Sequence, residues 1–310
     1  MDRTLARDFF HRLTESPEVQ AHPSDTMPPV EGVRPIDRAL IGYGRAFEHP
    51  CKIRLVRWLV RRLAAGQIRI KYAADAVVAI DPQDYIGWAI FKTGAYEPQT
   101  LALALHLMAA EPGLFVDVGA HFGWYTCAVA AIRGTKVLSI EPDAENCSAL
   151  RTNIARNGYQ NVTICNAAIG PDAALLALSK RSPGNSGTVA VSAMTTTSGP
   201  QTWVAAVTLE AVLNELVRPA ARPLVLKIDV EGFEPAVLAG LDFDGRFRPQ
   251  HVLIECDDAL CARSWGSRER FAAFFTERGY DLFDVSGQPL AYDDALPEFN
   301  VWARDRSSAR

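Results

Sequence analysis

The segment Leu224–Gly232 (LVLKIDVEG) carries three charged side chains in a run that is otherwise apolar. Lys227, Asp229 and Glu231 stand at alternate positions, so they lie on one face for as long as the chain is a β-strand. A central parallel strand is normally apolar throughout, and burying an unpaired charge is costly, so charges at its end need a reason. We favour a reactive site, in which a carboxylate accepts a proton and the lysine orients it. A Lys–Asp pair that only neutralises itself is the structural alternative.

A second motif lies upstream, where the apolar run Leu114–Val118 leads into the loop Asp117–Gly123 (DVGAHFG) and a helical pattern begins at Trp124. Glycine lets backbone approach a ligand closely, and the helix behind the loop offers free N–H groups to an anion. The spacing Gly-x-x-x-Gly differs from the Gly-x-Gly-x-x-Gly of dehydrogenases. Replacing Gly119 with Val is therefore predicted to abolish ligand binding in a protein that stays folded.

An acidic residue, Glu141, ends the next apolar run, Lys136–Ile140. A carboxylate at the tip of this second strand can accept the hydroxyl protons of a ribose. The structural alternative is an acid that is stabilised by the dipole of the following helix. The loop and the acid together are more specific than either alone, and they favour nucleoside binding.

Short apolar runs alternate with helical patterns through most of the chain, which predicts an α/β fold whose mostly parallel sheet is covered on both faces. The strand candidates are Leu114–Val118, Lys136–Ile140, Val162–Cys165, Leu224–Val230 and His251–Cys256, and the helical stretches include Asp143–Asn157 and Thr208–Val217. Tyr280–Val285 and Phe299–Ala303 follow with no helix between them, which suits an antiparallel pair at a sheet edge. The Ser/Thr/Gly-rich stretch Ser182–Thr202 is too long for a simple connection and is a candidate lid.

Residues 1–79 differ from the rest and are predicted to form a partly helical N-terminal extension, before a single α/β domain over residues 80–310. Residues 51–64 have the periodicity of a helix. Its apolar positions are Leu55, Val56, Leu59, Val60 and Leu63, and Arg54, Arg57 and Arg61 lie on another side. A basic amphipathic helix can bind an anionic membrane surface. We expect the more common arrangement, a helix packed on its own domain with a solvated basic face.

The composition is that of a globular protein with a real core, because 48% of the 310 residues are hydrophobic and 22% are charged. The formal net charge of −4 disfavours a nucleic-acid partner, since phosphate binding usually needs a basic excess. The six cysteines include no Cys-x-x-Cys pair, which is typical of free thiols in a reducing compartment. No apolar run approaches the roughly 20 residues of a membrane span, and no signal peptide is visible, so we expect a cytoplasmic protein.

Several motifs, taken in order along the chain, resemble those of FkbM-type methyltransferases. The resemblance covers residues 80–303 and is most specific in its K-x-D-V-E-G-x-E block. The matching segments are Gly94–Pro98 (GAYEP), Asp117–Thr126 (DVGAHFGWYT), Glu141-Pro142, Asn166–Ala168 and Lys227–Glu234 (KIDVEGFE). One residue departs from the pattern, because His121 stands where the family usually has Asn.

The resemblance implies a class I methyltransferase fold, which is a Rossmann-like, mostly parallel seven-stranded sheet with an antiparallel last strand, here preceded by the helical N-terminal extension. It also implies S-adenosyl-L-methionine as the cofactor. The cofactor-binding residues that the family motifs carry over to this chain are Glu97, Asp117, Gly119, His121, Gly123, Tyr125, Thr126, Glu141, Asn166 and Ala167.

The resemblance further implies methyl transfer, most often to a hydroxyl group of a natural product or a sugar-like small molecule. An alcohol acceptor needs a base for its proton. Asp229 and Glu231 are the candidates, with Lys227 tuning or orienting Asp229. His121 is a second candidate base, although satisfying a backbone group of its own loop is the simpler role.

Several alternatives remain open. A divalent cation held by Asp229, Glu255 and Asp257 is one that we do not predict. An N-methyltransferase acting on a peptide or amide nitrogen would use the same cofactor. A nicotinamide-dependent oxidoreductase would share the glycine loop but leaves the charged strand unexplained, and a non-catalytic nucleoside-binding module would need no base. The expected partner is a small-molecule or peptide acceptor, and homodimer formation is left open.

Overall fold

The computed structural model describes residues 30–46, 52–73, 75–180, 189–192, 202–217, 223–291, 296 and 300–308. The candidate lid predicted at Ser182–Thr202 lies outside these residues except for 189–192 and Thr202.

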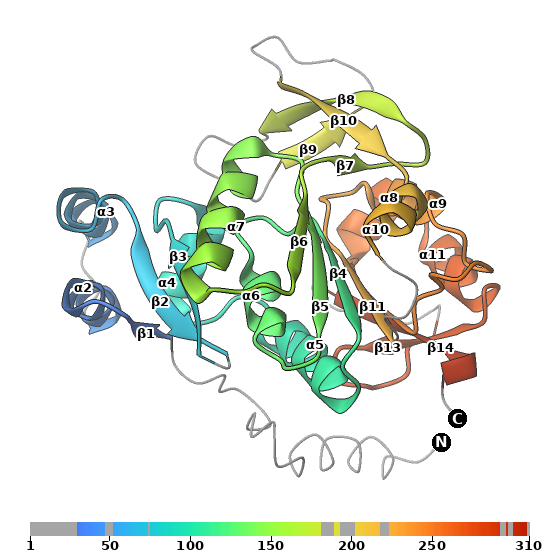
Figure 1. Ribbon diagram of the computed structural model, residues 1–310, viewed down its shortest axis with the longest axis horizontal. Coiled ribbons are helices and arrows are strands. Elements are labelled where there is room, and N and C mark those ends of the chain that lie inside the picture. The colour runs from blue at the N-terminus through green and yellow to red at the C-terminus, as the bar shows by residue number, and fades with distance from the viewer. Residues whose placement is uncertain are drawn as a thin grey trace.

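A seven-stranded sheet forms the centre of the molecule (Figure 1), in the order β13-β14-β12-β11-β4-β5-β6. Its strands are β4 (Leu114–Val118), β5 (Lys136–Ile140), β6 (Val162–Cys165), β11 (Leu224–Ile228), β12 (His251–Glu255), β13 (Tyr280–Asp284) and β14 (Asn300–Asp305). The strands from β6 to β12 are parallel, and β14 is antiparallel to both of its neighbours. The predicted fold, a mostly parallel sheet with an antiparallel last strand, is confirmed.

Helices cover both faces of this sheet, which explains why its strands are apolar at successive positions. The first face carries α5 (Pro98–Ala110), α6 (Trp124–Ala130) and α7 (Ala144–Asn157), and the second carries α8 (Leu209–Leu216), α9 (Glu234–Ala239), α10 (Asp258–Ser264) and α11 (Arg268–Thr276). Phe115 and Val225 pack toward the first face, whereas Val116 and Leu226 pack toward the second. Each strand therefore contributes to two hydrophobic cores.

Local signals set the ends of several helices. Asp143 caps α7, because its side chain accepts hydrogen bonds from the backbone N–H groups of Glu145 and Asn146. Gly158 ends the same helix with φ 69°, the left-handed conformation that a C-terminal cap uses. Thr208 caps α8, because its side-chain oxygen accepts a hydrogen bond from the backbone N–H of Ala211.

The chain before α5 forms a layer of its own, at the left of Figure 1. It comprises β1 (Glu31–Gly32), α2 (Pro35–Ala46), α3 (Lys52–Leu63), β2 (Ile68–Tyr72), β3 (Ala76–Ile80) and α4 (Tyr85–Thr93). The predicted helix at 51–64 is present as α3. The three strands, which pair antiparallel in the order β1-β2-β3, were not predicted. The sequence IRIKY of β2 alternates between buried and exposed side chains, a strand pattern that could have been found.

This layer shares the core of the central sheet. Ile70 and Val78 belong to the same buried cluster as Phe115. Two asparagines of α7 extend the contact, because the Oδ1 atoms of Asn157 and Asn153 accept from backbone N–H groups of β3 at 2.8 and 2.9 Å. The division at residue 79 stays a prediction, and it falls within β3.

A third sheet of four strands lies beyond the carboxyl end of β6, at the top of Figure 1, in the order β7-β10-β8-β9. Its strands are β7 (Ala168–Ile169), β8 (Ala174–Lys180), β9 (Val189–Ser192) and β10 (Thr202–Val207). A short 3₁₀ helix, Arg306–Ser308, follows β14. Within the described parts of the chain, every helix is too short or too polar to cross a membrane.

Candidate functional site

A row of polar side chains crosses three central strands near their carboxyl ends. The strand pairing puts Ser139, Asp117 and Lys227 at one level on β5, β4 and β11, and all three are buried. Helix α6 lies over this row. Thr126 Oγ1 donates to Asp117 Oδ2 at 2.7 Å, and the Lys227 ammonium lies 4.5 Å from the centre of the Tyr125 ring. The predicted residues Asp117, Tyr125, Thr126 and Lys227 therefore belong to one cluster.

Asp229 directly follows β11, and Glu255 is the last residue of the neighbouring strand β12. Lys227 Nζ lies 2.9 Å from Asp229 Oδ2. Burial opposes the charge of Asp229, but Lys227 outweighs it and lowers the pKa of this carboxyl below its ordinary value. Burial and the charge of Asp229 raise the pKa of Glu255 to about 10, so Glu255 is protonated at neutral pH and hydrogen-bonds Asp229. Asp229 is thus a carboxylate held between a cation and a neutral acid.

Glu97 is a further acidic residue whose charge acts on Lys227. It precedes α5 with φ 45°, and its Oε2 accepts a hydrogen bond from the Tyr125 hydroxyl at 2.6 Å. Burial and then the charge of Asp229 raise the pKa of Glu97. Burial would lower the pKa of Lys227, but the carboxylates of Asp229, Asp117 and Glu97 more than offset it and raise that pKa. Lys227 is therefore a permanent cation among acids.

Glu231 does not share the strand face with Lys227, because β11 ends at Ile228 and only Asp229 continues its pairing, with its backbone N–H donating to Val118 O. Glu231 lies in the following turn with φ 57°. The expectation that all three charges alternate along one strand is therefore wrong for its last member. Glu231 still belongs to the electrostatic cluster, since its charge helps to raise the pKa of Glu255.

The backbone at Gly119 packs closely against the backbone that directly follows β11. A Cβ built on it would lie 1.8 Å from the backbone oxygen of Asp229, and its φ is +85°. The backbone N–H groups of Gly119 and Ala120 both donate to Ile140 O, at 2.9 and 3.0 Å. The glycine therefore serves the packing of three strand ends. The expectation that Gly119→Val leaves the protein folded is corrected, because the Cβ would meet protein backbone before it met a ligand.

Gly119→Ala is expected to destabilise the fold beyond the roughly 1–2 kcal/mol that a left-handed conformation costs a non-glycine residue. Gly158→Ala is the matched control, because Gly158 also has positive φ (+69°) but an added Cβ would meet no atom within 4 Å. Urea unfolding of both variants separates the clash from the backbone preference. Equal losses of unfolding free energy would show that the approach to Asp229 relaxes without cost.

The conformation of His121 explains how it can replace Asn. Its φ is 52°, in the left-handed region where Asn, Asp and His occur far more often than other non-glycine residues. Its backbone N–H donates to Glu141 Oε2 at 2.8 Å. Burial lowers the pKa of the His121 imidazole, so the ring is neutral at pH 7.

Glu141 is buried at the end of β5, where the loop after β4 reaches it. Its Oε1 accepts from the backbone N–H of Asp143 at 2.9 Å, in addition to the bond from His121. Burial outweighs these bonds and raises the pKa of Glu141 to about 7. The side chain of Asn166 donates to the backbone oxygens of Glu141 and Pro142 at 2.7 and 3.2 Å, which fixes the turn after β5.

A mainly apolar pocket opens beside this turn. It is lined by Val118, Gly119, Ile140, Pro142, Ala167, Ala168, Ile169, Val230 and Phe233. The ends of β4, β5 and β11 and the start of β7 thus converge on it. The carboxyl ends of parallel strands are where open α/β sheets bind ligands.

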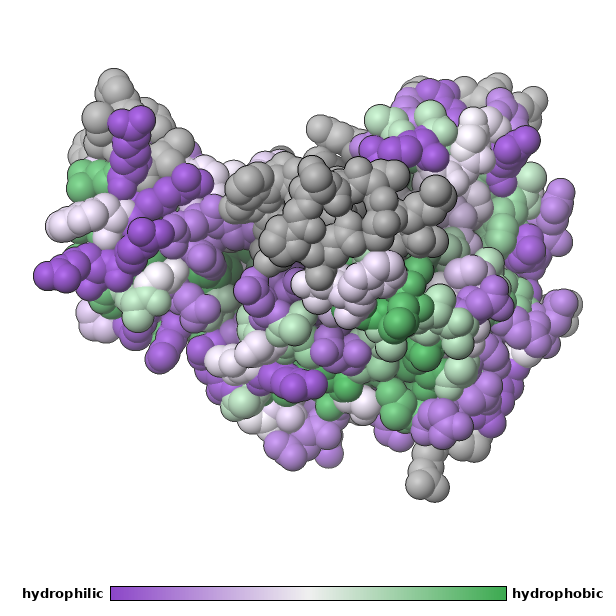
Figure 2. All heavy atoms as spheres, turned by 90° about the horizontal axis from the view of Figure 1, so that it is seen from above, coloured by the Kyte–Doolittle hydropathy of each residue, from purple (hydrophilic) through white to green (hydrophobic). Residues whose placement is uncertain are grey.

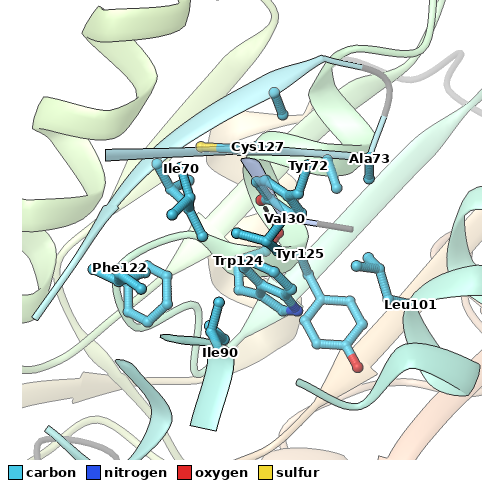
Figure 3. Packing of buried hydrophobic residues seen from close by; sticks show 14 of the residues in the cluster. Val30, Ile70, Tyr72, Ala73, Ile90, Leu101, Phe122, Trp124, Tyr125 and Cys127 are labelled. Carbon is cyan, nitrogen blue, oxygen red and sulfur yellow. Dashed lines mark hydrogen bonds between the residues drawn. The ribbon is translucent and has the colours of Figure 1, made fainter. Parts of the chain in front are cut away.

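Trp124 ties the loop to the N-terminal layer (Figure 3). It follows Gly123, whose φ of +93° allows the sharp start of α6. Its indole stacks on Tyr72 of β2, with ring centres 4.0 Å apart, and Tyr72 donates a hydrogen bond to the Trp124 backbone oxygen. Its Nε1 donates to Tyr96 O at 3.0 Å. Residues well before β4 therefore help to position the loop.

The alternative of a cation at Asp229, Glu255 and Asp257 is not supported by the third residue. Asp257 caps α10, since its side chain accepts from Leu260 N at 2.6 Å. No group of three or more His, Cys, Asp or Glu side chains is arranged to hold a metal ion in the part of the chain that the structure describes.

Two acids were missed or undervalued by the sequence analysis. Glu255 was considered only as a metal ligand, although its place at the end of the strand beside β11 was a usable signal. Glu234 is fully buried, and its Oε1 accepts from the backbone N–H groups of Gly232 and Val230 at 2.9 and 3.2 Å. It holds the turn that carries Glu231.

Comparison with known families gives one clear match. The model of the family described as "Methyltransferase FkbM domain" matches residues 117–282, which is more than half of the chain. No curated protein matches the chain.

The chain is also similar to solved structures, at low identity. A putative O-methyltransferase from Klebsiella pneumoniae has 14% identity and a TM-score of 0.39, over 68% of this chain and 81% of that one. A ribosomal protein L11 methylase from Lactobacillus delbrueckii subsp. bulgaricus has 14% identity and a TM-score of 0.35, over 67% and 80%. These TM-scores are too low to identify the fold. The fold is identified by the order and direction of the strands.

Proposed function

Because the chain belongs to the FkbM methyltransferase family, and is therefore an S-adenosylmethionine-dependent methyltransferase, we propose that it methylates a hydroxyl group of a natural product or sugar-like small molecule. The observation that carries this proposal is the Asp229 carboxylate, which follows β11. Lys227 holds it at 2.9 Å, and protonated Glu255 hydrogen-bonds it. Such a carboxylate suits an acceptor that loses a proton.

The residues present fit the cofactor. The apolar pocket beside Pro142 and Ala167 suits the flat base of a nucleoside, and the Glu141 carboxyl next to it suits the ribose hydroxyls. The loop from Gly119 to Gly123 would carry the methionine part past the cluster around Lys227. When bound, the sulfonium supplies an already activated methyl group.

The chain's own part in the reaction is to align the acceptor and to receive its proton. Alignment of the attacking oxygen with the methyl group accounts for much of the acceleration. Asp229 has a lowered pKa and is a weak base, but the acceptor oxygen becomes strongly acidic as its bond to the methyl carbon forms. A weak base that is fully ionised is therefore adequate, and Lys227 keeps Asp229 ionised. The proton passes from the acceptor oxygen to Asp229.

A direct test compares ligands and acceptors. S-adenosylhomocysteine at about 100 times its Kd should stabilise the protein by about 2.7 kcal/mol in a thermal shift measurement, whereas NAD should not. Turnover should then be found with hydroxyl acceptors. Stabilisation by NAD alone would contradict the proposal, and turnover only with amine or amide acceptors would favour the N-methyltransferase alternative.

The assignment of Glu141 to the ribose predicts a pH-dependent affinity. Its pKa of about 7 in the free protein means that the carboxyl must lose a proton before it accepts hydroxyl hydrogen bonds. The Kd for S-adenosylhomocysteine, measured by calorimetry, should therefore rise by up to about tenfold per pH unit below about 7. Glu141→Ala should weaken binding by about 1.5–3 kcal/mol, and Glu141→Gln should remove the pH dependence.

Glu145→Gln is the matched control for this measurement, because Glu145 is exposed in the first turn of α7. It should keep both the affinity and the pH dependence. An unchanged affinity in Glu141→Ala would remove Glu141 from the cofactor site.

A further inference from the structure

Helix α3 presents two side-by-side stripes to solvent that the methyl-transfer site does not use. The buried face of α3 is the stripe at spacings of four, Lys52, Val56 and Val60. The outer face carries Arg54, Arg57 and Arg61 in one stripe and Leu55, Trp58 and Arg62 in the next, and all six side chains are exposed. The expectation was a helix packed on its own domain with a solvated basic face, and the structure adds the exposed apolar side chains of Leu55 and Trp58 to that outer face.

Exposed apolar side chains lie next to the arginines, and a basic face that only contacts water does not require them. Trp58 is 59% exposed and Leu63, at the end of the helix, is 53% exposed. Tyr85, at the start of α4, is 65% exposed. A tryptophan and a leucine, Trp58 and Leu55, beside arginines on one helix face are the composition of helices that lie at a lipid–water interface.

Hydrogen bonds fix part of this surface. Arg61 Nη2 donates to Gln83 Oε1 at 2.7 Å, and Arg57 Nη2 donates to Gln83 O at 3.5 Å. Gln83 lies two residues before Tyr85, so these contacts bring the segment that carries Tyr85 to the basic stripe. We call Arg54, Leu55, Trp58, Arg62, Leu63 and Tyr85, together with the Gln83-bound arginines Arg57 and Arg61, the α3 surface.

The position of α3 suits a flat partner. It lies in the outermost layer of the molecule, with α2, on the side away from the third sheet and the C-terminal helices (Figure 1). In the space-filling view strongly hydrophilic side chains cover much of the lobe on this side (Figure 2). The basic surface belongs to a chain with a net charge of −4, so its charge is local and does not follow from the composition.

We propose that the α3 surface docks this protein on an anionic lipid surface, with Trp58 and Leu55 entering the interface and the arginines contacting lipid headgroups. Opposite charge supplies the attraction, since basic side chains close to a negatively charged leaflet each favour binding. Three aliphatic or aromatic side chains on α3 supply an apolar contribution that nucleic-acid phosphates would not use. A two-fold contact between two copies through α3 would place arginines against arginines, which disfavours self-association.

The test is co-sedimentation of the full chain with vesicles of phosphatidylcholine that contain phosphatidylglycerol, against vesicles of phosphatidylcholine alone. Binding should occur only to the anionic vesicles and should weaken as salt is added. Arg54→Glu with Arg62→Glu should lower the partition coefficient by about tenfold or more, since two attractions become two repulsions. Trp58→Ala should lower it by about fivefold or more, because a large apolar group leaves the interface.

Two matched variants separate this site from general effects. Arg133→Glu with Lys136→Glu makes the same change in net charge at two exposed positions, one before β5 and one at its first residue, and Trp203→Ala removes a tryptophan that is 50% exposed on β10. Both should bind vesicles as the unaltered protein does, and all four variants should keep its thermal unfolding temperature and its methyl-transfer rate.

Each other outcome overturns the proposal. Failure of the unaltered chain to bind anionic vesicles at low salt removes the lipid partner, and equal losses in the matched variants remove the α3 surface. Binding of a short DNA duplex with the same dependence on Trp58 and the arginines, and no binding to vesicles, would assign the surface to nucleic acid. A dimer that dissociates on Arg54→Glu with Arg62→Glu would assign it to a second copy. None of these results depends on the methyl acceptor, so they leave the proposed function standing.

Discussion

Asp229→Asn is expected to lower the rate of methyl transfer by a factor of roughly 10²–10⁴, the usual contribution of a general base. The amide keeps the shape of the side chain and a hydrogen bond to Glu255, but it removes the charge that receives the proton and that pairs with Lys227 at 2.9 Å. Single-turnover kinetics with saturating cofactor should show the loss in the chemical step. Calorimetry with S-adenosylhomocysteine should show little change in affinity.

The matched control for this variant is Asp281→Asn. Asp281 also pairs with a cation, Arg306, at 2.7 Å, but it lies half-exposed on the edge strand β13. It should leave the rate unchanged. Near-normal turnover in Asp229→Asn would refute the base assignment and move attention to Glu231 or His121. Loss of cofactor binding would instead place Asp229 on the methionine amino group, and recovery of activity with added divalent cation would favour the metal alternative.

Lys227→Met is expected to lower the free energy of unfolding by about 3–5 kcal/mol, the usual cost of removing one partner of a buried ion pair. Lys227 is 2% exposed, and it is the cation that offsets the charges of Asp229, Asp117 and Glu97. Urea unfolding at neutral pH measures the loss. Lys136→Met, at an exposed position on β5, is the control and should stay within about 0.5 kcal/mol of the unaltered protein.

The pH dependence of Lys227→Met has a definite sign. Without the lysine, burial raises the pKa of Asp229 above its unfolded value, so the folded variant binds more protons than the unfolded chain. Its stability should therefore recover as the pH falls through this raised pKa of Asp229. In the unaltered protein the pKa of Asp229 is lowered, so its stabilising contribution is present above the unfolded pKa and is lost as the pH falls toward the folded pKa. If Lys227→Met were as stable as the Lys136→Met control, the carboxyl groups around Lys227 would already be neutral in the folded protein.

The sequence predicted the sheet well because its strands are buried on both faces and are bounded by helices. The end of β4 at Val118 and the end of β5 just before Glu141 were predicted from the apolar runs in the sequence. The N-terminal strands were missed, because the helical periodicity of α3 was the strongest pattern in residues 1–79. The alternation in β2 is short, and β1 has only two residues.

The part of the site that was not predicted depends on which residues face each other across strands. The positions of Asp229 and Glu255 at the ends of neighbouring strands were predicted, as ligands of a possible cation, but the hydrogen bond between the two side chains was not. The tight packing of Gly119 against the neighbouring strand end was missed for the same reason. A Cβ on Gly119 would meet the backbone oxygen of Asp229, and no pattern within the loop records that contact.

The stack of Tyr72 on Trp124 has a consequence for how such domains can be exchanged between proteins. Trp124 lies inside the segment 117–282 that the family model matches, whereas Tyr72 lies outside it. A chimera that inherited only the matched segment would receive a tryptophan whose stacking partner came from an unrelated ancestor. Substitutions at these two positions should therefore be compatible only in pairs, and the unit of inheritance that keeps the loop in place reaches back at least to β2.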